Sequence, residues 1–305
     1  MAQHEADYQR VVDPLESTLF LDGSTIEIIR SPRREQPPRY ALFDFDGTLS
    51  LIREGWPEVM VPMMVEALQA TGTKESAEEL DKMAGEFVAE LTGKQTIYQM
   101  IRLVEEIERR GGQAEDPAVY KQRYHDLLME RITSRREALR SGSAEAESML
   151  VPGSIEILDE LCRRGVQLYL ASGTDEQYVK EEVQLLGLDK YFGTYVYGAQ
   201  EDYKSFSKAM VIERILRENS VPGDFLLGFG DGFVEIQNVK DAGGIAVGVA
   251  SNESERNGRP DPWKRDRLIG VGADLVIPDY ADWKTLIEFI WGGGERIEVI
   301  NEQVM

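Results

Sequence analysis

The chain has 305 residues, of which 42% are hydrophobic and 9% aromatic, so it can build the core of one large domain or two ordinary ones. Its formal net charge of −21 repels nucleic acid and anionic lipid over long range, so we expect neither as a partner. No apolar run reaches the roughly 18 residues of a membrane span, and Met1–Arg10 has no signal-peptide core. The single cysteine, Cys162, rules out an internal disulfide framework. We therefore expect a cytoplasmic protein.

Residues 1–39 are expected to form an N-terminal extension. Thr18–Leu21 and Thr25–Ile29 flank Asp22-Gly23, a pair typical of tight hairpin turns. This pattern predicts a hairpin docked on the edge of a sheet, and a flexible arm is the alternative. Ser31–Arg39 contains three prolines and is expected to be an irregular connector.

Residues 40–50 contain the most informative stretch. Tyr40–Phe43 is an apolar run that predicts a short buried strand of a parallel sheet. Asp44 and Asp46 follow it, and because burying charge is costly, both should lie at the carboxyl end of the strand, where open α/β sheets bind ligands. The turn at Gly47 allows the two carboxylates to converge. Two close carboxylates that face an anionic group favour a divalent cation between them.

Two other interpretations of this stretch are weaker. An Asp-Gly pair is common in surface turns, but here an apolar strand leads into it. A calcium-binding loop that starts at Asp44 would need Gly at position 49 and Glu at position 55, where the chain has Leu49 and Gly55.

Residues 51–150 have almost no strand signal and are expected to form an inserted helical domain, called the cap below. Apolar residues recur at helical spacing in four segments, and each break between them holds Gly or Pro. The four predicted helices span residues 57–70, 75–91, 95–110 and 117–140.

Residues 151–291 alternate between strand and helix, which implies right-handed crossovers and a parallel sheet. Strands are expected at 166–171, 194–197, 224–229, 245–249 and 273–277, and helices at 154–164, 175–186, 206–217, 234–241, 263–269 and 281–291. With residues 40–50 they predict an α/β core with a doubly wound, mostly parallel Rossmann-like sheet that carries the all-helical cap. Residues 292–305 are expected to be a C-terminal tail without a clear signal.

Polar residues follow two more of the predicted strands. Ser172 and Gly173 come directly after the strand at 166–171, where a hydroxyl and backbone N–H groups can donate to a phosphate oxygen, although a simple helix cap would look the same. Asp231 lies between glycines at the end of the strand at 224–229, with Glu235 four residues on. Asp231 would bind magnesium, and Glu235 would bind it directly, bind it through water, or orient a ligand.

A lysine is expected near the start of the helix at 206–217. Lys204 and Lys208 both qualify; Lys208 lies 23 residues before Asp231 and opens the helical pattern. Its ammonium would neutralise phosphoryl oxygens and keep Asp44 ionised. The alternative for either lysine is an ordinary solvated side chain.

These four stretches, in this order, resemble the four motifs of the haloacid dehalogenase (HAD) superfamily of phosphohydrolases: D-x-D-G-T-L at Asp44, a hydroxyl at Ser172, Lys208, and G-D-x-x-x-D at Asp231, with Glu235 in the last place. The distance of Lys208 from Asp231 in the sequence resembles that of the third motif, so we favour Lys208 over Lys204. The resemblance covers about residues 40–290. A helical insert after the first motif is similar to the branch with phosphoglycolate phosphatase-like and β-phosphoglucomutase-like members.

The resemblance implies a mechanism. Asp44 would attack phosphorus and form an aspartyl-phosphate, and Asp46 would give a proton to the leaving oxygen and later take one from water. Mg²⁺ would be held by Asp44, the backbone carbonyl of Asp46, Asp231 and, directly or through water, Glu235. The presence of Asp46 argues against dehalogenation, in which no leaving alcohol needs a proton.

We therefore expect a Mg²⁺-dependent phosphatase of a small phosphorylated metabolite, such as a sugar phosphate or a phosphoglycolate-like ester. A phosphomutase of the β-phosphoglucomutase type and an inactive binding protein on the same fold are the alternatives. The candidates for substrate selection are Arg53 beside the first motif and three residues between cap helices, Lys94, Gln95 and Thr96, unless these are ordinary exposed polar residues. The sequence leaves the oligomeric state open.

Overall fold

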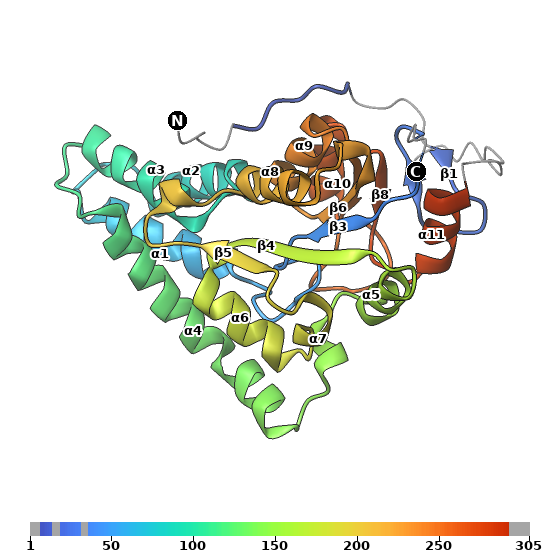
Figure 1. Ribbon diagram of the computed structural model, residues 1–305. Coiled ribbons are helices and arrows are strands. Elements are labelled where there is room, and N and C mark those ends of the chain that lie inside the picture. Colours follow the sequence, from blue (N-terminus) through green and yellow to red (C-terminus); the bar gives the residue numbers. More distant parts are fainter. Residues whose placement is uncertain (1–6, 14–18, 32–35, 293–305) are drawn as a thin grey trace.

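The computed structural model describes residues 7–13, 19–31 and 36–292. It contains an eight-stranded sheet in the order β1-β2-β8-β7-β6-β3-β4-β5, with helices on both faces and a helical domain at one end (Figure 1). The strands are β1 Leu19–Phe20, β2 Glu27–Ile28, β3 Tyr40–Phe43, β4 Gln167–Asp175, β5 Val196–Ala199, β6 Leu226–Gly230, β7 Ile245–Val249 and β8 Leu275–Ile277. The strands from β3 to β8 pair in parallel, so the expected fold class is confirmed.

Two layers of helices cover the sheet (Figure 1). The helices of the core are α5 Ser154–Arg163, α6 Glu176–Leu185, α7 Asp189–Phe192, α8 Lys208–Asn219, α9 Phe233–Asp241, α10 Pro262–Gly270 and α11 Trp283–Gly292. Leu42 of β3 packs with apolar residues of α8, α9 and α10, whereas its neighbour Phe43 packs with those of α5, α6, α7 and α11. Because successive residues of a strand face opposite sides of the sheet, apolar side chains cover both faces of β3. A strand that is buried on both faces belongs at the centre of the sheet.

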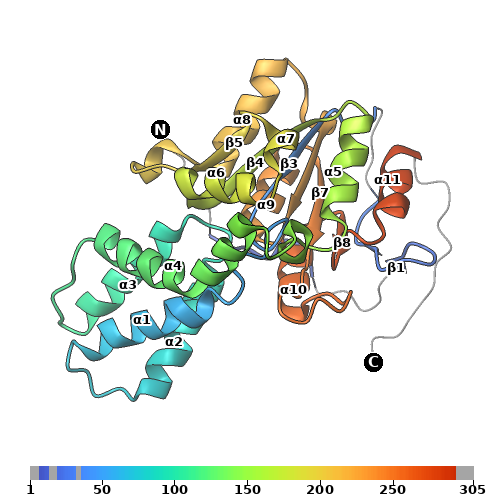
Figure 2. The same ribbon diagram turned by 90° about the horizontal axis from the view of Figure 1, so that it is seen from below.

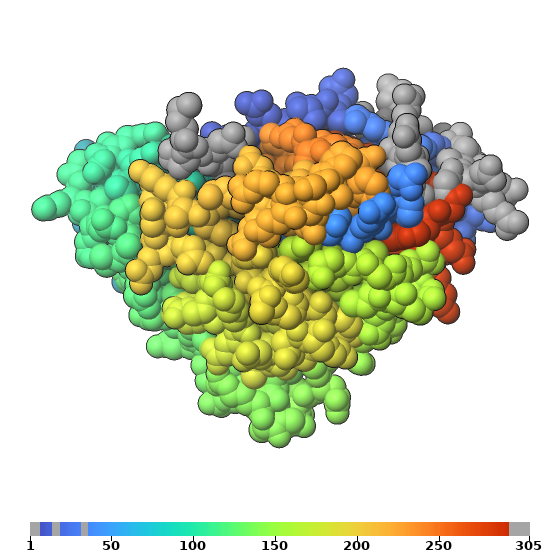
Figure 3. Space-filling view, in the orientation of Figure 1, coloured from blue at the N-terminus to red at the C-terminus, as the bar shows by residue number. Residues whose placement is uncertain are grey.

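The cap is a four-helix bundle that projects from one end of the sheet (Figure 2). Its helices are α1 Pro57–Gln69, α2 Ala77–Glu90, α3 Thr96–Arg109 and α4 Pro117–Ser141. Met60, Met63 and Met64 are buried in its interior. Figure 3 shows the cap directly against the core on the face in view. None of the helices in the described ranges is both long and apolar enough to cross a lipid bilayer.

The N-terminal extension has two described parts. β1 and β2 form an antiparallel hairpin, and β2 adds antiparallel to β8 at the edge of the sheet; Thr18 lies outside the described residues. Residues 7–13, called the strap below, run over α9 and α10 (Figure 1): the N–H groups of Val11 and Val12 donate to the carbonyl of Gly270 over 2.7 and 3.1 Å, and Tyr8 packs edge-on against Phe233. Residues 293–305 of the expected tail lie outside the described ranges.

Two boundaries differ from the prediction in a way that matters for the site. β4 continues past Ala171 to Asp175, because Asp175 still pairs with β5 after a register shift. Ser172 and Gly173 therefore lie in the irregular end of a strand, and the expected helix N-terminus begins only at Glu176 of α6. Likewise α8 begins at Lys208, where Ser207 caps it, and not at residue 206.

Candidate active site

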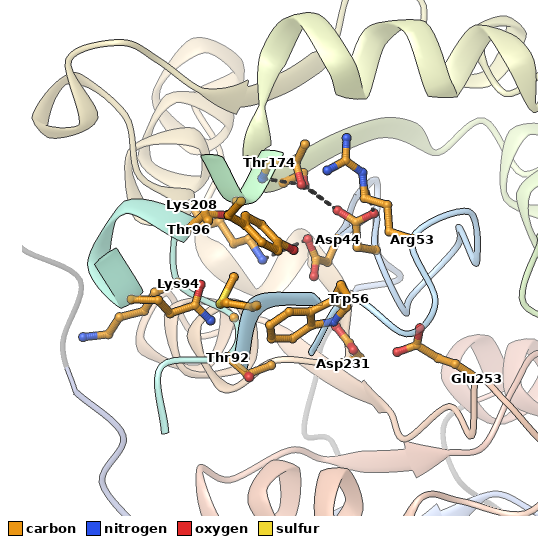
Figure 4. Close-up of a pocket in the computed structure, with 17 residues that line it drawn as sticks. Asp44, Arg53, Trp56, Thr92, Lys94, Thr96, Thr174, Lys208, Asp231 and Glu253 are labelled. Carbon is orange, nitrogen blue, oxygen red and sulfur yellow. Dashed lines mark hydrogen bonds and ion pairs between the residues drawn. The ribbon is translucent and has the colours of Figure 1, made fainter. Parts of the chain in front are cut away.

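The parallel pairing of β3 with β4 and β6 brings three of the predicted stretches to one edge of the sheet. Asp44 extends β3 and donates its N–H to the carbonyl of Phe229 in β6 over 2.9 Å. Its carboxylate faces a cavity between core and cap, and the residue is 6% exposed (Figure 4). Asp46, Ser172, Gly173, Lys208 and Asp231 also line this cavity.

A buried ammonium ties Asp44 to the helical layer. Lys208 Nζ lies 2.9 Å from Asp44 Oδ1 and 2.7 Å from Glu235 Oε2, and the side chain is 2% exposed. Burial opposes the charge, but the two carboxylates outweigh it and raise the pKa of Lys208, so it remains an ammonium. Burial raises the pKa of Asp44, and Lys208 opposes that rise. Lys204, the competing lysine, lies instead over the ring of Tyr203.

Glu235 holds this arrangement from the first turn of α9. Its Oε1 accepts a hydrogen bond from the N–H of Gly232 over 2.6 Å, while Oε2 contacts Lys208. The Glu235 carboxylate therefore caps the N-terminus of α9 with one oxygen and holds the Lys208 ammonium with the other. Gly230 and Gly232 leave room for the Glu235 side chain, because a Cβ on Gly230 would come 2.0 Å from the Glu235 Cγ.

Asp231 is held by one contact of its backbone and one of its side chain. Its N–H donates to Thr48 Oγ1 over 2.9 Å, and its Oδ2 lies 2.8 Å from Lys264 Nζ. Lys264 also lies 2.7 Å from Glu253 Oε1. A Cβ on Gly47, which has φ +72°, would lie 2.3 Å from Asp231 Oδ2, so only glycine lets the first motif approach so closely.

Asp46 is turned toward β4 and the start of the cap. Its Oδ2 accepts from Thr174 Oγ1 over 2.9 Å and from Ser172 Oγ over 3.4 Å, and its Oδ1 lies 3.7 Å from Arg53 Nε. Burial raises the pKa of Asp46 to about 6, with Arg53 opposing the rise and Glu182 adding to it. Such a carboxyl can carry a proton near neutral pH and release it again.

The four candidate residues for substrate selection differ in whether they line the cavity and in what their side chains contact. Arg53 lines the cavity but gives Nε and Nη2 to Glu182, over 3.0 and 2.9 Å. Lys94 directs its ammonium away from Asp44 (Figure 4), to Asp7 at 2.6 Å. Gln95 is not among the lining residues, and its side-chain amide donates to two backbone carbonyls of the core, those of Tyr203 over 3.1 Å and Phe206 over 2.8 Å. Thr96 lines the cavity.

The cap loop at 92–96 closes against two core glycines. A Cβ on Gly173 would lie 2.9 Å from the carbonyl oxygen of Lys94, and one on Gly232 would lie 2.7 Å from the Cα of Gly93. Backbone therefore meets backbone at both points, and the cap covers the cavity. The cap contributes the lining residues Trp56, Met60, Thr92, Thr96, Gln99 and Tyr124.

Sequence reasoning missed Thr174, Lys264 and Glu253. Thr174 and Glu253 belong to the carboxyl ends of β4 and β7 at the same sheet edge, so the rule that found Asp44 could have singled them out. Lys264 is in α10, and no local pattern marks it, because its partner Asp231 is far away in the sequence.

A family model of haloacid dehalogenase-like hydrolases matches residues 38–243. The chain belongs to this family. The resemblance found in the motifs is thereby confirmed, and the protein is a hydrolase of the HAD type. A search of curated protein sequences gives no match.

Solved structures of HAD proteins share the fold. A predicted phosphoglycolate phosphatase from Haemophilus somnus 129pt is 17% identical, with a TM-score of 0.54, over 82% of this chain and 98% of that one. β-Phosphoglucomutase from Clostridium difficile is 12% identical, with a TM-score of 0.54, over 83% and 97%. A mutant of CbbY from Rhodobacter sphaeroides, in complex with xylulose-(1,5)bisphosphate, is 20% identical, with a TM-score of 0.51, over 80% and 96%.

The buried bridge predicts a large difference between two lysine variants. Lys208→Met leaves Asp44 and Glu235 buried without their cation, and we expect it to lower the free energy of unfolding by about 3–5 kcal/mol in metal-free buffer. The deficit should shrink as the pH falls, because protonation of Asp44 removes one unpaired charge.

The matched control is Lys204→Met, at an exposed position, which should change stability by less than about 0.5 kcal/mol. Urea denaturation of both variants measures the difference. Equal stabilities would show that the ammonium of Lys208 does not hold the site together.

Proposed function

We propose that this protein is a Mg²⁺-dependent phosphatase that hydrolyses a small phosphate monoester through an aspartyl-phosphate on Asp44. The observation that carries the proposal is the placement of Asp44, 2.9 Å from the ammonium of Lys208, in one covered cavity with Asp46. A carboxylate nucleophile, a fixed cation for phosphoryl oxygens and a carboxyl with a raised pKa are the groups that phosphoryl transfer to an aspartate needs.

The donor set at the sheet edge fits magnesium. Asp44, Asp231 and Glu235 each offer a carboxylate oxygen, and these oxygens lie within 4.8 Å of one another. Mg²⁺ prefers such hard oxygen ligands. Asp44, Asp231 and the backbone carbonyl of Asp46 would hold it, and Glu235, whose two oxygens already accept from Gly232 and Lys208, would act through water. When bound, the ion supplies positive charge to the phosphoryl oxygens.

In the first step an Asp44 oxygen attacks phosphorus, and the bond from phosphorus to the ester oxygen breaks. Asp46 donates its proton to that oxygen, so the leaving group departs as a neutral alcohol. Among the described residues, Oδ1 of Asp46 has no hydrogen-bond partner, so this atom is available to the leaving oxygen. The ammonium of Lys208 and the hydroxyl of Ser172 stabilise the charge on the other phosphoryl oxygens.

In the second step water attacks phosphorus of the aspartyl-phosphate. Asp46, now ionised and held by Thr174, takes a proton from this water, and the bond between phosphorus and Asp44 breaks. Free phosphate leaves and both aspartates return to their starting states. A phosphomutase would use the same residues and return the phosphoryl group to the sugar, so release of free phosphate separates the two activities.

The nucleophile assignment predicts that Asp44→Asn abolishes release of phosphate from p-nitrophenyl phosphate, at least about 10³-fold, because the amide cannot form the acyl phosphate. The control, Asp81→Asn, changes an exposed aspartate of α2 and should retain wild-type turnover. Circular dichroism shows whether both variants are folded. Turnover by a folded Asp44→Asn variant would exclude the covalent step.

The metal assignment predicts that chelation removes turnover and that added Mg²⁺ restores it. Binding of Mg²⁺ also relieves repulsion among the three clustered carboxylates, so it should raise the thermal unfolding midpoint of the wild-type protein. Asp231→Asn should weaken both effects. A midpoint that is the same with and without Mg²⁺, together with full turnover in excess chelator, would contradict a magnesium site.

A further inference from the structure

The cavity extends from the phosphoryl site toward the cap, and the walls there decide which leaving group fits. Figure 4 shows Trp56, Thr92 and Thr96 of the cap among the residues around Asp44. Met60, Gln99 and Tyr124 complete the cap side, and all three are buried, at 1%, 4% and 6% exposure. A group bound here loses most of its water, so any charge on it would need a partner from the lining.

The cations of the described lining all contact carboxylates. Lys208 lies between Asp44 and Glu235, and it is needed for the phosphoryl group itself. Arg53 gives two of its nitrogens to Glu182, which is 0% exposed, so the pair is neutral and firmly buried. A second anionic group on the substrate would compete for this guanidinium with Glu182 and with Asp46, whose Oδ1 lies 3.7 Å from Arg53 Nε, so it would gain little from the cation.

Two further features of the same region disfavour an anion. Lys94 turns its ammonium out of the cavity toward Asp7, so it does not face the substrate (Figure 4). Glu253 and Asp231 line the cavity on the core side and share the ammonium of Lys264, 2.7 and 2.8 Å away, so two carboxylates face one cation and negative charge remains in excess. A carboxylate or second phosphate on the leaving group would meet repulsion there.

The uncharged lining suits a hydroxyl-rich molecule. Thr96 and Tyr124 offer hydroxyl groups. Thr92 Oγ1 and Gln99 Nε2 already donate to the carbonyl of Val88, over 3.0 and 3.5 Å, and their oxygens remain acceptors for a ligand hydroxyl. Trp56 and Met60 offer apolar surface, against which the C–H face of a sugar ring can pack. Pockets that combine apolar walls with a few polar groups orient a ligand by its hydroxyls.

We propose that the leaving group is an uncharged polyol, so that the substrate is a monosaccharide monophosphate. Esters whose leaving group carries an anion, such as phosphoglycolate or a sugar bisphosphate, are then poor substrates. This selectivity rests on the phosphatase function proposed above and refines it, because it chooses between the two classes of substrate that the sequence left open.

A turnover panel tests this selectivity in the wild-type protein. It compares pentose and hexose monophosphates with phosphoglycolate and a hexose bisphosphate, and p-nitrophenyl phosphate reports the chemistry alone. We expect the kcat/KM of at least one monosaccharide monophosphate to exceed those of both esters with an anionic leaving group about 100-fold or more. A preference for phosphoglycolate or the bisphosphate would overturn the inference, as would equal rates throughout the panel.

Binding to Asp44→Asn separates this inference from the proposed function. If the wild-type protein does not hydrolyse p-nitrophenyl phosphate, the phosphatase function fails, but calorimetry on Asp44→Asn still shows which esters the cavity accepts. Tighter binding of a monosaccharide monophosphate than of phosphoglycolate supports the uncharged subsite. The reverse order overturns it.

A charge placed in the lining should shift the preference. Gln99→Lys adds a cation beside the leaving group, and we expect it to lower the ratio of kcat/KM for the monosaccharide monophosphate to that for phosphoglycolate about tenfold or more. The control, Gln69→Lys, adds the same charge at the exposed end of α1 and should leave the ratio unchanged.

Thr96→Lys repeats the test at a less buried lining position in case Gln99→Lys does not fold. A ratio that stays at the wild-type value in a folded lining variant would contradict the proposed position of the leaving group. A shift of equal size in Gln69→Lys would attribute the effect to overall charge and contradict it as well.

Discussion

The site depends on one buried ammonium. Lys208 enters from the first residue of α8 and meets Asp44, which follows β3, and Glu235, in the first turn of α9. Three elements that are far apart in the sequence are thus fixed relative to one another by charge. Removing such a cation from water is expensive, and only the two carboxylates make its burial favourable. The same contacts place fixed positive charge beside a carboxylate oxygen of Asp44.

The order of the sheet explains why so few residues define the chemistry. β3 lies between β4 and β6, so their carboxyl ends deliver Asp44, Ser172 and Asp231 to one edge. Glycines at 47, 173 and 232 then let separate backbone segments approach closely enough to share that edge. The cap covers it with a loop that touches two of these glycines, so the fit of the cap depends on residues of the core motifs.

Much of this could be predicted from the chain alone. Asp44, Asp46 and Asp231 stand out because charge directly after an apolar strand has few structural explanations, and the alternation of strands and helices places them at one edge. Lys208 could be chosen over Lys204 because it opens the helical pattern and its spacing from Asp231 resembles that of the family's third motif. Less could be said about Arg53, Lys94 and Gln95, because the partner of each, Glu182, Asp7 or the carbonyls near residue 205, is set by tertiary packing. The end of β4 was misplaced because strand pairing with β5 continues through a Ser-Gly-Thr sequence that is typical of a loop.

The strap at residues 7–13 connects the core to the cap. It is held on α10 at Gly270, packs on α9 through Tyr8 and reaches the cap through Asp7 and Lys94. A movement of the cap that carries Lys94 away from the sheet must either break the ion pair between Asp7 and Lys94 or detach the strap from α10. The strap is therefore a tether, and any opening of the cap would disturb a part of the polypeptide that does not line the cavity.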